Sequence, residues 1–334
     1  MGNDTLLAVR DLKVHFPVGG GLVRSKQTVK AVDGVSFDIR RGSTFGIVGE
    51  SGSGKSTTAL AVMRLVDITS GTVRLGEADI GSLKGDALRQ QRRRFQMVFQ
   101  DPYASLNPRK RAGDAILDAL NLMDVGASGE RAALAQKLFV QTGLKAEQMQ
   151  LFPHQFSGGQ RQRIVLARAL AGQPELVVCD EPVSALDVAI QAQMLNLMLR
   201  LQRDFGLSYL FISHDLGVVR HMCNEVAVMY LGRIVEQAGR DALFARPLHP
   251  YTRALWSAAP SFDPGARSRG RRILLQGDPP SPLNIAPGCR FAGRCPYALD
   301  LCRSQEPQLR QVLPGHTVAC HRVDDAGVST YDTT

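Results

Sequence analysis

The chain carries the stretch Gly49-Glu50-Ser51-Gly52-Ser53-Gly54-Lys55-Ser56, which matches the pattern G-x-x-x-x-G-K-[ST] at every position. An apolar segment from Ser43 to Val48 precedes it and is predicted to be a strand, and a helical run begins near Thr57. A glycine-rich turn with a chance lysine is the alternative, but such a turn needs neither the strand before it nor the helix after it. The stretch therefore predicts a phosphate-binding loop in an α/β protein.

Each part of this loop has a chemical role toward a polyphosphate. The glycines let backbone N–H groups turn inward, and the start of the following helix adds its dipole. Lys55 supplies a point charge near the β- and γ-phosphates, and the Ser56 hydroxyl can bind Mg²⁺. The predicted nucleotide-binding residues of the loop are Gly49, Ser51, Gly52, Ser53, Gly54, Lys55, Ser56 and Thr57.

Length and composition limit the class of protein. The 334 residues are 44% hydrophobic and 21% charged, which is typical of a globular chain with a core domain and an appendage. No apolar run approaches the ~18–20 residues of a membrane-spanning helix, and the first residues lack a signal-peptide pattern. We therefore expect neither a membrane-spanning nor an exported protein.

The net charge of +9 is compatible with nucleic acid, acidic lipid or an anionic ligand as a partner. Its densest run of basic residues extends from Arg89 to Arg94. Such a run is most simply a solvated helix face, so the charge alone does not select a partner.

Strand-like and helix-like segments alternate from about residue 57 to 245, which predicts a largely parallel sheet with helices. The strands Leu176–Cys179 and Tyr209–Ile212 flank an amphipathic helix that Gly206 ends. Nearer the N-terminus, short alternating stretches predict strands at Leu6–Arg10 and Val35–Ile39. Pro17 to Lys30, between them, is glycine-rich and basic and is predicted to be a loop.

The composition changes after residue 245. Residues 246–288 carry eight prolines and predict a linker, and the residues after them predict a small appendage that contains four cysteines. Residues 323–334 are predicted to be a frayed tail.

An acidic pair follows a second apolar strand. Leu176-Val177-Val178-Cys179 delivers Asp180 to the tip of the strand, where it can hold the Mg²⁺ shell, and Glu181 can polarise an attacking water. An acidic pair at a strand end is common in α/β proteins. The phosphate loop earlier in the chain favours the catalytic interpretation.

The stretch Phe156-Ser157-Gly158-Gly159-Gln160 predicts a helix start, with Ser157 as the N-cap and glycines that expose backbone N–H groups to a second anion. Taken with the phosphate loop and the acidic pair, it resembles the ATP-binding subunits of ABC transporters, whose signature usually begins with Leu where this chain has Phe156. The implied fold class is α/β, an ABC-type P-loop ATPase with an antiparallel β subdomain, a helical subdomain and an irregular C-terminal appendage. The signature residues are Ser157, Gly158, Gly159 and Gln160.

The resemblance implies further site residues. Gln100 corresponds to the glutamine of the Q-loop, Ser184 and Asp187 to the D-loop, and His214 to the histidine that contacts the γ-phosphate. Phe16 is the candidate aromatic that stacks on adenine, with Val29 as the alternative. The implied Mg²⁺ ligands are Ser56, Gln100 and Asp180, and the implied catalytic residues are Glu181 and His214.

In this family the signature acts on the nucleotide of a second subunit. Each ATP lies between Lys55 of one chain and a Ser157-type signature of the other, so the resemblance implies a dimer that closes on ATP and reopens after hydrolysis. The single phosphate loop in this chain agrees with that requirement.

Two further stretches resemble the ATPases of dipeptide and oligopeptide importers: Ser105-Leu106-Asn107-Pro108-Arg109, and Pro247-Leu248-His249-Pro250-Tyr251-Thr252 with Leu255. The resemblance is nearest to the dipeptide F-type subunit. It implies a related, non-identical ATPase partner, two membrane permease subunits, an extracytoplasmic substrate-binding protein and a peripheral place on the cytoplasmic face of the cell membrane. The implied domains are 1–245, with a helical subdomain at about 101–170, then 246–322, and a tail at 323–334.

The terminal cysteines run C-x5-C-x6-C-x17-C at Cys289, Cys295, Cys302 and Cys320. Four thiolates can hold zinc or a [4Fe–4S] cluster, and the spacing alone does not decide between them. The family resemblance favours the [4Fe–4S] cluster. His316 and His321 are alternative ligands, whereas Cys179 and Cys223 are predicted to be core residues.

Alternative functions remain open in the sequence. The cargo could be glutathione or a metal chelate, because no residue of this chain is expected to bind the cargo. A soluble ABC ATPase that acts on nucleic acid usually has two ATPase halves or a long coiled coil, so no nucleic-acid partner is expected. A degenerate binding module is disfavoured because Glu181, His214 and the signature are all present.

Overall fold

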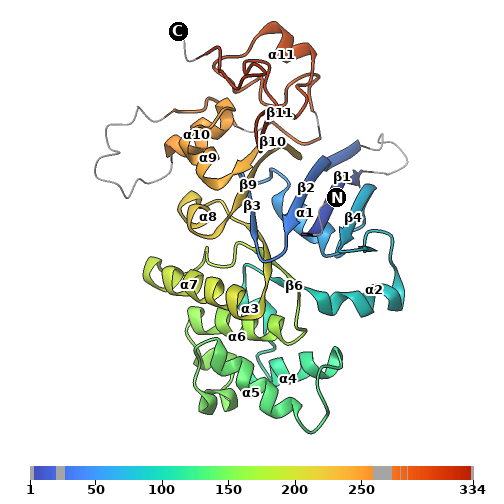
Figure 1. Ribbon diagram of the computed structural model, residues 1–334, viewed down its shortest axis with the longest axis vertical. Helices are drawn as coiled ribbons and strands as arrows, with labels where there is room; N and C mark the ends of the chain where they lie inside the picture. The colour runs from blue at the N-terminus through green and yellow to red at the C-terminus, as the bar shows by residue number, and fades with distance from the viewer. Residues whose placement is uncertain (1–3, 20–26, 259–272, 279, 284, 332–334) are drawn as a thin grey trace. The chain divides into compact units, whose positions relative to one another are not determined.

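The computed structural model describes residues 4–19, 27–258, 273–278, 280–283 and 285–331 (Figure 1). The chain divides into two compact units, each built from three segments. Unit 1 consists of Met1–Ala8, Asp38–Thr44 and Arg74–Ile212; unit 2 consists of Val9–Phe37, Phe45–Val73 and Ser213–Thr334. The phosphate loop thus shares unit 2 with the C-terminal region, and the acidic strand end lies in unit 1.

Three parallel strands form the sheet of unit 1, in the order β8-β7-β6. These are β6 (Phe95–Val98), β7 (Leu176–Asp180) and β8 (Ser208–Ile212). Their apolar residues are buried on both faces, as expected for a parallel sheet. Helix α7 (Val188–Phe205) connects β7 to β8, and Gly206 ends it with a φ of 65°. The predicted parallel α/β arrangement is confirmed.

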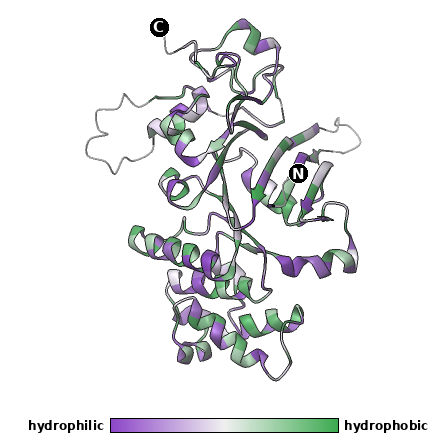
Figure 2. Ribbon diagram, viewed as in Figure 1, coloured by the Kyte–Doolittle hydropathy of each residue, from purple (hydrophilic) through white to green (hydrophobic). Residues whose placement is uncertain are grey.

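A helical subdomain completes unit 1. It contains α3 (Pro102–Ser105), α4 (Ala112–Leu122), α5 (Arg131–Gln141) and α6 (Gly158–Leu170). Hydrophobic and hydrophilic residues alternate along these helices (Figure 2), and the buried positions of α4 and α5 are apolar or glycine, whereas Leu122 and Val140 stay exposed. The helical subdomain expected from the fold class is therefore present.

The sheet of unit 2 combines the central part of the chain with its C-terminal region. The strand order is β11-β12-β10-β9-β3, where β9 pairs parallel with β3 and antiparallel with β10. β12 then pairs antiparallel with β10 through Glu236↔Val318, Gln237↔Thr317 and Ala238↔His316. The strands are β3 (Thr44–Val48), β9 (Glu225–Tyr230), β10 (Arg233–Gly239), β11 (Arg310–Leu313) and β12 (His316–Val318). The C-terminal region extends this sheet, so the predicted boundary at residue 245 does not coincide with a boundary between compact units.

The antiparallel sheet has the order β2-β1-β4-β5. Its strands are β1 (Thr5–Val18), β2 (Gln27–Arg40), β4 (Ser70–Leu75) and β5 (Ala78–Asp79). β1 and β2 are longer than predicted, and the expected loop from Pro17 to Lys30 overlaps both strands, with residues 20–26 outside the described part. The predicted strand ends at Arg10, where the apolar–polar alternation is interrupted by the polar pair Arg10 and Asp11. In the structure both residues are exposed and Asp11 has a φ of 45°, but the strand continues beyond them.

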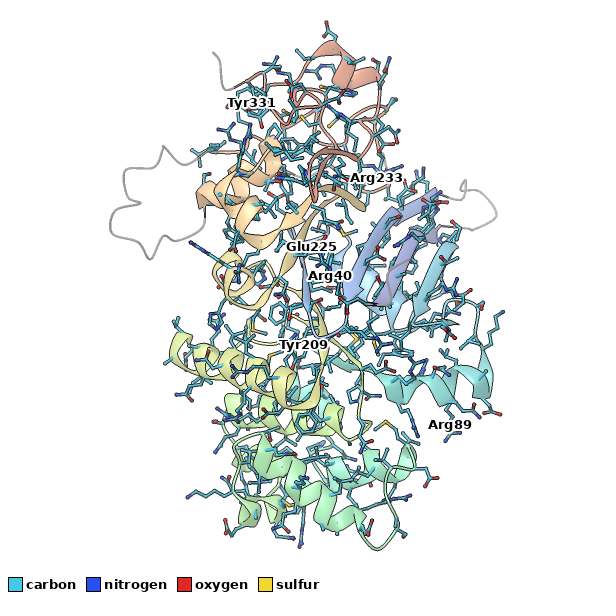
Figure 3. The ribbon with its side chains drawn as sticks, viewed as in Figure 1. Arg40, Arg89, Tyr209, Glu225, Arg233 and Tyr331 are labelled. Carbon is cyan, nitrogen blue, oxygen red and sulfur yellow. The ribbon has the colours of Figure 1, made fainter. Side chains whose placement is uncertain are left out.

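The remaining helices are short. They are α1 (Lys55–Val62), α2 (Gly85–Gln91), α8 (Leu216–Met222), α9 (Arg240–Ala245), α10 (Pro250–Ala258) and α11 (Asp300–Ser304), with 3₁₀ turns at Arg92–Arg94, Ala146–Gln150 and Pro153–Gln155. Arg89, labelled in Figure 3, is exposed on α2, as are Arg92 and Arg93 on the turn that follows, in agreement with a solvated helix face. Of the helices that the structure describes, none combines the length and apolarity needed to cross a bilayer.

The C-terminal end differs from the expected frayed tail. Tyr331, labelled in Figure 3, is 4% exposed, stacks on Tyr297 with ring centroids 4.6 Å apart, and donates its hydroxyl hydrogen bond to the carbonyl of Leu248. Val323 is 1% exposed and forms a bridge with Ser329. Residues 323–331 are thus held by aromatic and apolar contacts, which the mostly polar composition of this segment did not predict. Residues 332–334 lie outside the described part.

Candidate nucleotide-binding site

The phosphate loop in unit 2 has the backbone that its glycines allow. Gly54, the N-cap of α1, has a φ of 105°, and Gly52 has a φ of 77°. A Cβ at Gly54 would lie 2.2 Å from the Ala31 carbonyl oxygen, and one at Gly49 would lie 2.2 Å from that of Met229. A side chain is therefore excluded at both positions, and the loop can approach the strands beneath it closely.

Lys55 is fixed against the loop. Its Nζ donates to the carbonyl oxygens of Gly49 and Glu50 at 2.8 Å each and lies 3.5 Å from the Ser53 hydroxyl. The side chain is buried, whereas Ser51, Gly52 and Ser56 are exposed. One positive charge is thereby held behind a loop surface that is open to a ligand, as the sequence predicted for a phosphate site.

The acidic strand end and the Q-loop meet within unit 1. Gln100 donates from Nε2 to Glu181 Oε2 at 3.1 Å and to the Ser184 hydroxyl at 3.3 Å, and that hydroxyl donates to the Glu181 carbonyl at 3.0 Å. Asp180 is the last residue of β7. Glu181 has a φ of 49°, a region that non-glycine residues rarely occupy and that is frequent at functional sites. Three residues predicted separately, from the Q-loop, the acidic pair and the D-loop, are therefore brought together.

The signature residues form a capped helix start. Ser157 is the N-cap of α6, and its hydroxyl accepts from Gln160 N at 3.3 Å while Gln160 Oε1 accepts from Ser157 N at 2.9 Å. A Cβ at Gly159 would lie 2.5 Å from Ile190 Cγ2, so this position allows only glycine without rearrangement. Phe156, which replaces the usual Leu, is buried. The predicted N-cap is confirmed, and the second anion site stays a prediction.

His214 and Phe16 lie in unit 2. His214 is exposed and precedes Asp215, whose carboxylate caps α8 by accepting from Gly217 N at 2.7 Å. Phe16 lies near the end of β1 with 37% of its surface exposed, whereas Val29 is half-buried on β2. Their predicted roles toward the γ-phosphate and adenine stay predictions.

The predicted site residues thus fall into two sets. Unit 2 holds the phosphate loop, Phe16 and His214, whereas unit 1 holds Gln100, the acidic pair, the signature and the D-loop residues Ser184 and Asp187. The proposed Mg²⁺ ligands are divided in the same way, with Ser56 in unit 2 and Gln100 and Asp180 in unit 1.

The four terminal cysteines line one small cavity. Cys289, Cys295, Cys302 and Cys320 contribute to its wall together with His321, and Cys289 N donates to Cys302 O at 2.7 Å. Within the described residues, no three His, Cys, Asp or Glu side chains are arranged to hold one metal ion. The [4Fe–4S] cluster implied by the family resemblance, and the zinc alternative, stay predictions.

Two expectations concern residues near this cavity. His316 is not among the residues that line it, and its Nε2 lies 2.8 Å from Oε1 of the buried Glu236, so its role as an alternative ligand stays a prediction. Cys179 and Cys223 are buried core residues, as predicted, and burial raises the pKa of Cys223 above the range of a reactive thiol.

One feature of the site was not predicted from the sequence, an ion pair on the phosphate loop. Glu50 of the phosphate loop receives a bidentate ion pair from Arg294, at 2.6 and 3.1 Å, and its N–H donates to the Tyr251 hydroxyl at 2.8 Å. In the sequence, this ion pair is represented only by an acidic residue inside the loop and an arginine between two cysteines. Neither residue indicates that the other is its partner.

Comparison with known proteins defines the class first. The profile of the family ABC transporter matches residues 32–184, and that of the family Oligopeptide/dipeptide transporter, C-terminal region, matches residues 235–302. A solved dimeric ATP-binding cassette, bound to ADP and Pi in a post-hydrolysis state, is similar with a TM-score of 0.62 and 26% identity over 70% of this chain and 99% of that chain. The fold is that of an ABC-type P-loop ATPase.

Curated relatives then narrow the class. The oligopeptide transport ATP-binding protein AppF of Bacillus subtilis is 49% identical over 95% of this chain and 97% of its own length. The di/tripeptide transport ATP-binding protein DppF of Pseudomonas aeruginosa is 48% identical over 96% and 98%. The chain belongs to the ATP-binding subunits of the oligopeptide and dipeptide ABC importers. It is the ATPase subunit of a peptide importer. Proteins of this class use ATP and Mg²⁺, and the assignment argues against the alternative of an ATPase that acts on nucleic acid.

Proposed function

We propose that this ATPase subunit binds Mg·ATP on its own phosphate loop and hydrolyses it with Glu181 as the general base. The observation that carries the proposal is the contact of Gln100 with both Glu181 and Ser184. It holds the carboxylate that would take a proton from water beside the Q-loop that would sense the nucleotide.

The residues of the ATP site have distinct roles in this proposal. Lys55 and the loop N–H groups bind the β- and γ-phosphates, Phe16 stacks on adenine, and His214 contacts the γ-phosphate. Mg²⁺ would be held by the Ser56 hydroxyl, the Gln100 side-chain oxygen and the Asp180 carboxylate, which are oxygen ligands of the kind that Mg²⁺ prefers. When bound, Mg²⁺ neutralises charge on the β- and γ-phosphates.

A second ATPase completes each site. The chain has one phosphate loop and one signature, and the capped start of α6 exposes Gly158 N–H beside Ser157. In the proposed dimer these groups, with Gly159 and Gln160, face the nucleotide on the partner's loop, and Ser184 and Asp187 line the interface. The partner would be a related, non-identical subunit, as the resemblance to the dipeptide F-type ATPase implies.

Closing and reopening of the ATPase dimer would be transmitted to two permease subunits in the membrane. A cavity in unit 1 follows the Q-loop. Its apolar lining is Leu106, Ala115, Ala119 and Leu122, and its charged lining is Lys110, Arg111, Asp118 and Arg168. Leu122 is 70% exposed, a large apolar surface that a helix of the permease would cover. This docking would hold the subunit at the cytoplasmic face of the cell membrane as a peripheral protein.

The terminal cysteines would hold a [4Fe–4S] cluster with a structural role. Support comes from the cavity that all four cysteines line, with Cys302 and Cys320 buried and Cys289 and Cys295 half-buried. Zinc is the alternative metal at these four cysteines. The cargo would be a di- or oligopeptide selected by a substrate-binding protein outside the cytoplasm, with glutathione or a metal chelate as the alternatives.

The test is transport in a reconstituted system. The chain, its partner ATPase and the two permease subunits would be assembled in lipid vesicles, with the binding protein and a radiolabelled dipeptide supplied on the face from which cargo enters. ATP-dependent uptake that requires Lys55 would support the proposal. ATP hydrolysis that does not respond to the permease, the binding protein and peptide would contradict it.

A further inference from the structure

The segment Cys289–Cys295 carries two arginines, and both reach away from the cysteine cavity toward the nucleotide-binding part of unit 2. Arg294 forms a bidentate ion pair with Glu50, with Nη1–Oε2 and Nη2–Oε1 distances of 2.6 and 3.1 Å. The Arg294 side chain is 9% exposed. A paired, two-point contact of this kind restricts both position and orientation of the carboxylate.

Glu50 is held at its backbone as well. Its N–H donates to the Tyr251 hydroxyl at 2.8 Å, and its carbonyl accepts from Lys55 Nζ at 2.8 Å. Tyr251 belongs to α10 and is fully buried. Glu50 therefore has three anchors, and two of them come from residues after 245.

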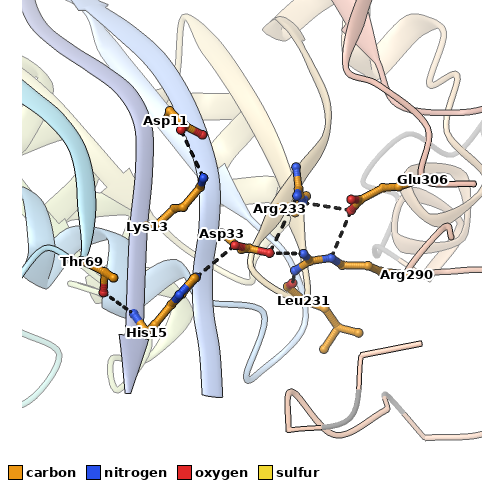
Figure 4. A network of polar contacts seen from close by, with 9 residues as sticks. All are labelled: Asp11, Lys13, His15, Asp33, Thr69, Leu231, Arg233, Arg290 and Glu306. Atoms are coloured by element: carbon orange, nitrogen blue, oxygen red, sulfur yellow. Dashed lines mark hydrogen bonds and ion pairs between the residues drawn. The ribbon is translucent and has the colours of Figure 1, made fainter. Parts of the chain in front are cut away.

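Arg290 fixes the segment that carries Arg294. It is 6% exposed and binds the Asp33 carboxylate on β2, the Leu231 carbonyl and Glu306, and Arg233 joins Asp33 to Glu306 from β10 (Figure 4). Phe291, between the two arginines, packs edge-on against Tyr230 at a centroid distance of 5.3 Å. Arg294 thus projects from a segment that is itself anchored by charge and by aromatic packing.

The negative charge of Glu50 affects how the loop can bind a polyphosphate ligand. Glu50 places a carboxylate on the loop that would bind ATP, and an uncompensated carboxylate there would repel the phosphates. Arg294 compensates that charge and holds the side chain in one orientation. Binding then requires less reordering of the loop, which favours affinity.

We propose that Arg294 is a positioning residue of the phosphate loop, through which the C-terminal region forms part of the ATP site of its own chain. This inference rests on the proposed binding of ATP to the loop. It assigns the C-terminal region a task in nucleotide affinity in addition to any that its cysteines perform.

The test measures binding of a fluorescent ATP analogue with Mg²⁺ to the full chain. We expect Arg294→Gln to raise Kd about tenfold and to change kcat at saturating ATP less than twofold. The matched control is Arg303→Gln, which removes an exposed arginine from the same region and should leave Kd unchanged. Glu50→Gln in the Arg294→Gln background should recover most of the lost affinity, because it removes the carboxylate that Arg294 compensates.

A purely structural role would not produce that recovery, so the double variant separates the two explanations. Unchanged Kd in Arg294→Gln, or a further loss in the double variant, would overturn the inference while leaving ATP binding intact. Absence of binding by the unmodified chain would instead refute the proposed function. If Arg294→Gln does not fold, Tyr251→Phe removes one anchor of Glu50 without a cavity and should raise Kd several-fold; an unchanged value there would overturn the inference.

Discussion

Gln100 Nε2 lies 3.1 Å from Glu181 Oε2, although the two residues are 81 positions apart in the chain. The same amide is 3.3 Å from the Ser184 hydroxyl. The Q-loop of unit 1 is therefore in direct contact with the carboxylate proposed to activate water. A substitution at either residue would change this contact.

The first prediction concerns this carboxylate. Glu181→Gln keeps the size of the side chain and one acceptor oxygen but removes its ability to take a proton. We expect the variant to bind ATP normally and to hydrolyse it about 10²–10⁴-fold more slowly, the range typical of general-base removal. Single-turnover hydrolysis in the assembled ATPase pair measures this, and a rate within a few-fold of the unmodified chain would show that another group is the base.

The second prediction concerns the capped start of α6. Ser157→Ala removes the hydroxyl that accepts from Gln160 N, and loss of an N-cap typically costs about 1 kcal/mol of folding free energy. In the assembled pair, hydrolysis should fall for the nucleotide on the partner's phosphate loop. Ser157→Thr retains a capping hydroxyl and serves as the control.

A partner that carries an inactivated phosphate loop of its own distinguishes the two sites in that experiment. With such a partner, Ser157→Ala in this chain should have little further effect on turnover. A loss of hydrolysis on this chain's own loop would mean that the signature does not act in trans.

The third prediction is a pH dependence of stability. Burial alone raises the pKa of Asp33, but the hydrogen bond and charge of Arg290, with His15 and Arg233, lower it below the ordinary 3.8. Because the folded-state pKa is depressed, the stabilisation is complete above about pH 4 and is lost as the pH falls further.

Asp33→Asn should therefore lower the free energy of unfolding by about 1.5–3 kcal/mol at pH 7, the usual worth of a hydrogen bond to a charged group. Denaturant unfolding of both proteins from pH 7 to pH 3 measures the difference, which should narrow below pH 4. The exposed Asp86→Asn on α2 is the control. A difference that stays constant with pH would exclude the ionised carboxylate as its source.

The fourth prediction concerns the cysteine cavity. Protein purified without oxygen should contain about four irons and four acid-labile sulfides per chain, with broad absorption near ~400 nm. Cys302→Ser should abolish both, whereas Cys223→Ser, which alters a buried core cysteine, should not. Stoichiometric zinc in place of iron would refute the cluster and leave the ATP site unaffected.

Much of the site could be predicted from the sequence because its signals are local. The phosphate loop needs glycines and a lysine within eight positions, and the N-cap pair Ser157 and Gln160 is separated by three residues. Helix α7 likewise follows from its apolar spacing and from the glycine that ends it. Interactions of this range depend on backbone geometry that a few neighbouring residues determine together.

The contacts that only the tertiary structure decided join distant parts of the chain. Arg294 is 244 positions from Glu50, and Tyr331 is 83 positions from Leu248. His316, a candidate ligand by proximity in sequence, instead faces Glu236 because β12 pairs with β10. An arginine can satisfy its charge with any carboxylate that the fold brings near, so its partner is set by strand pairing and packing, which no local pattern encodes. The sequence by itself determined that this chain is an ABC-type ATPase; the tertiary structure alone decided that its C-terminal region supports the phosphate loop.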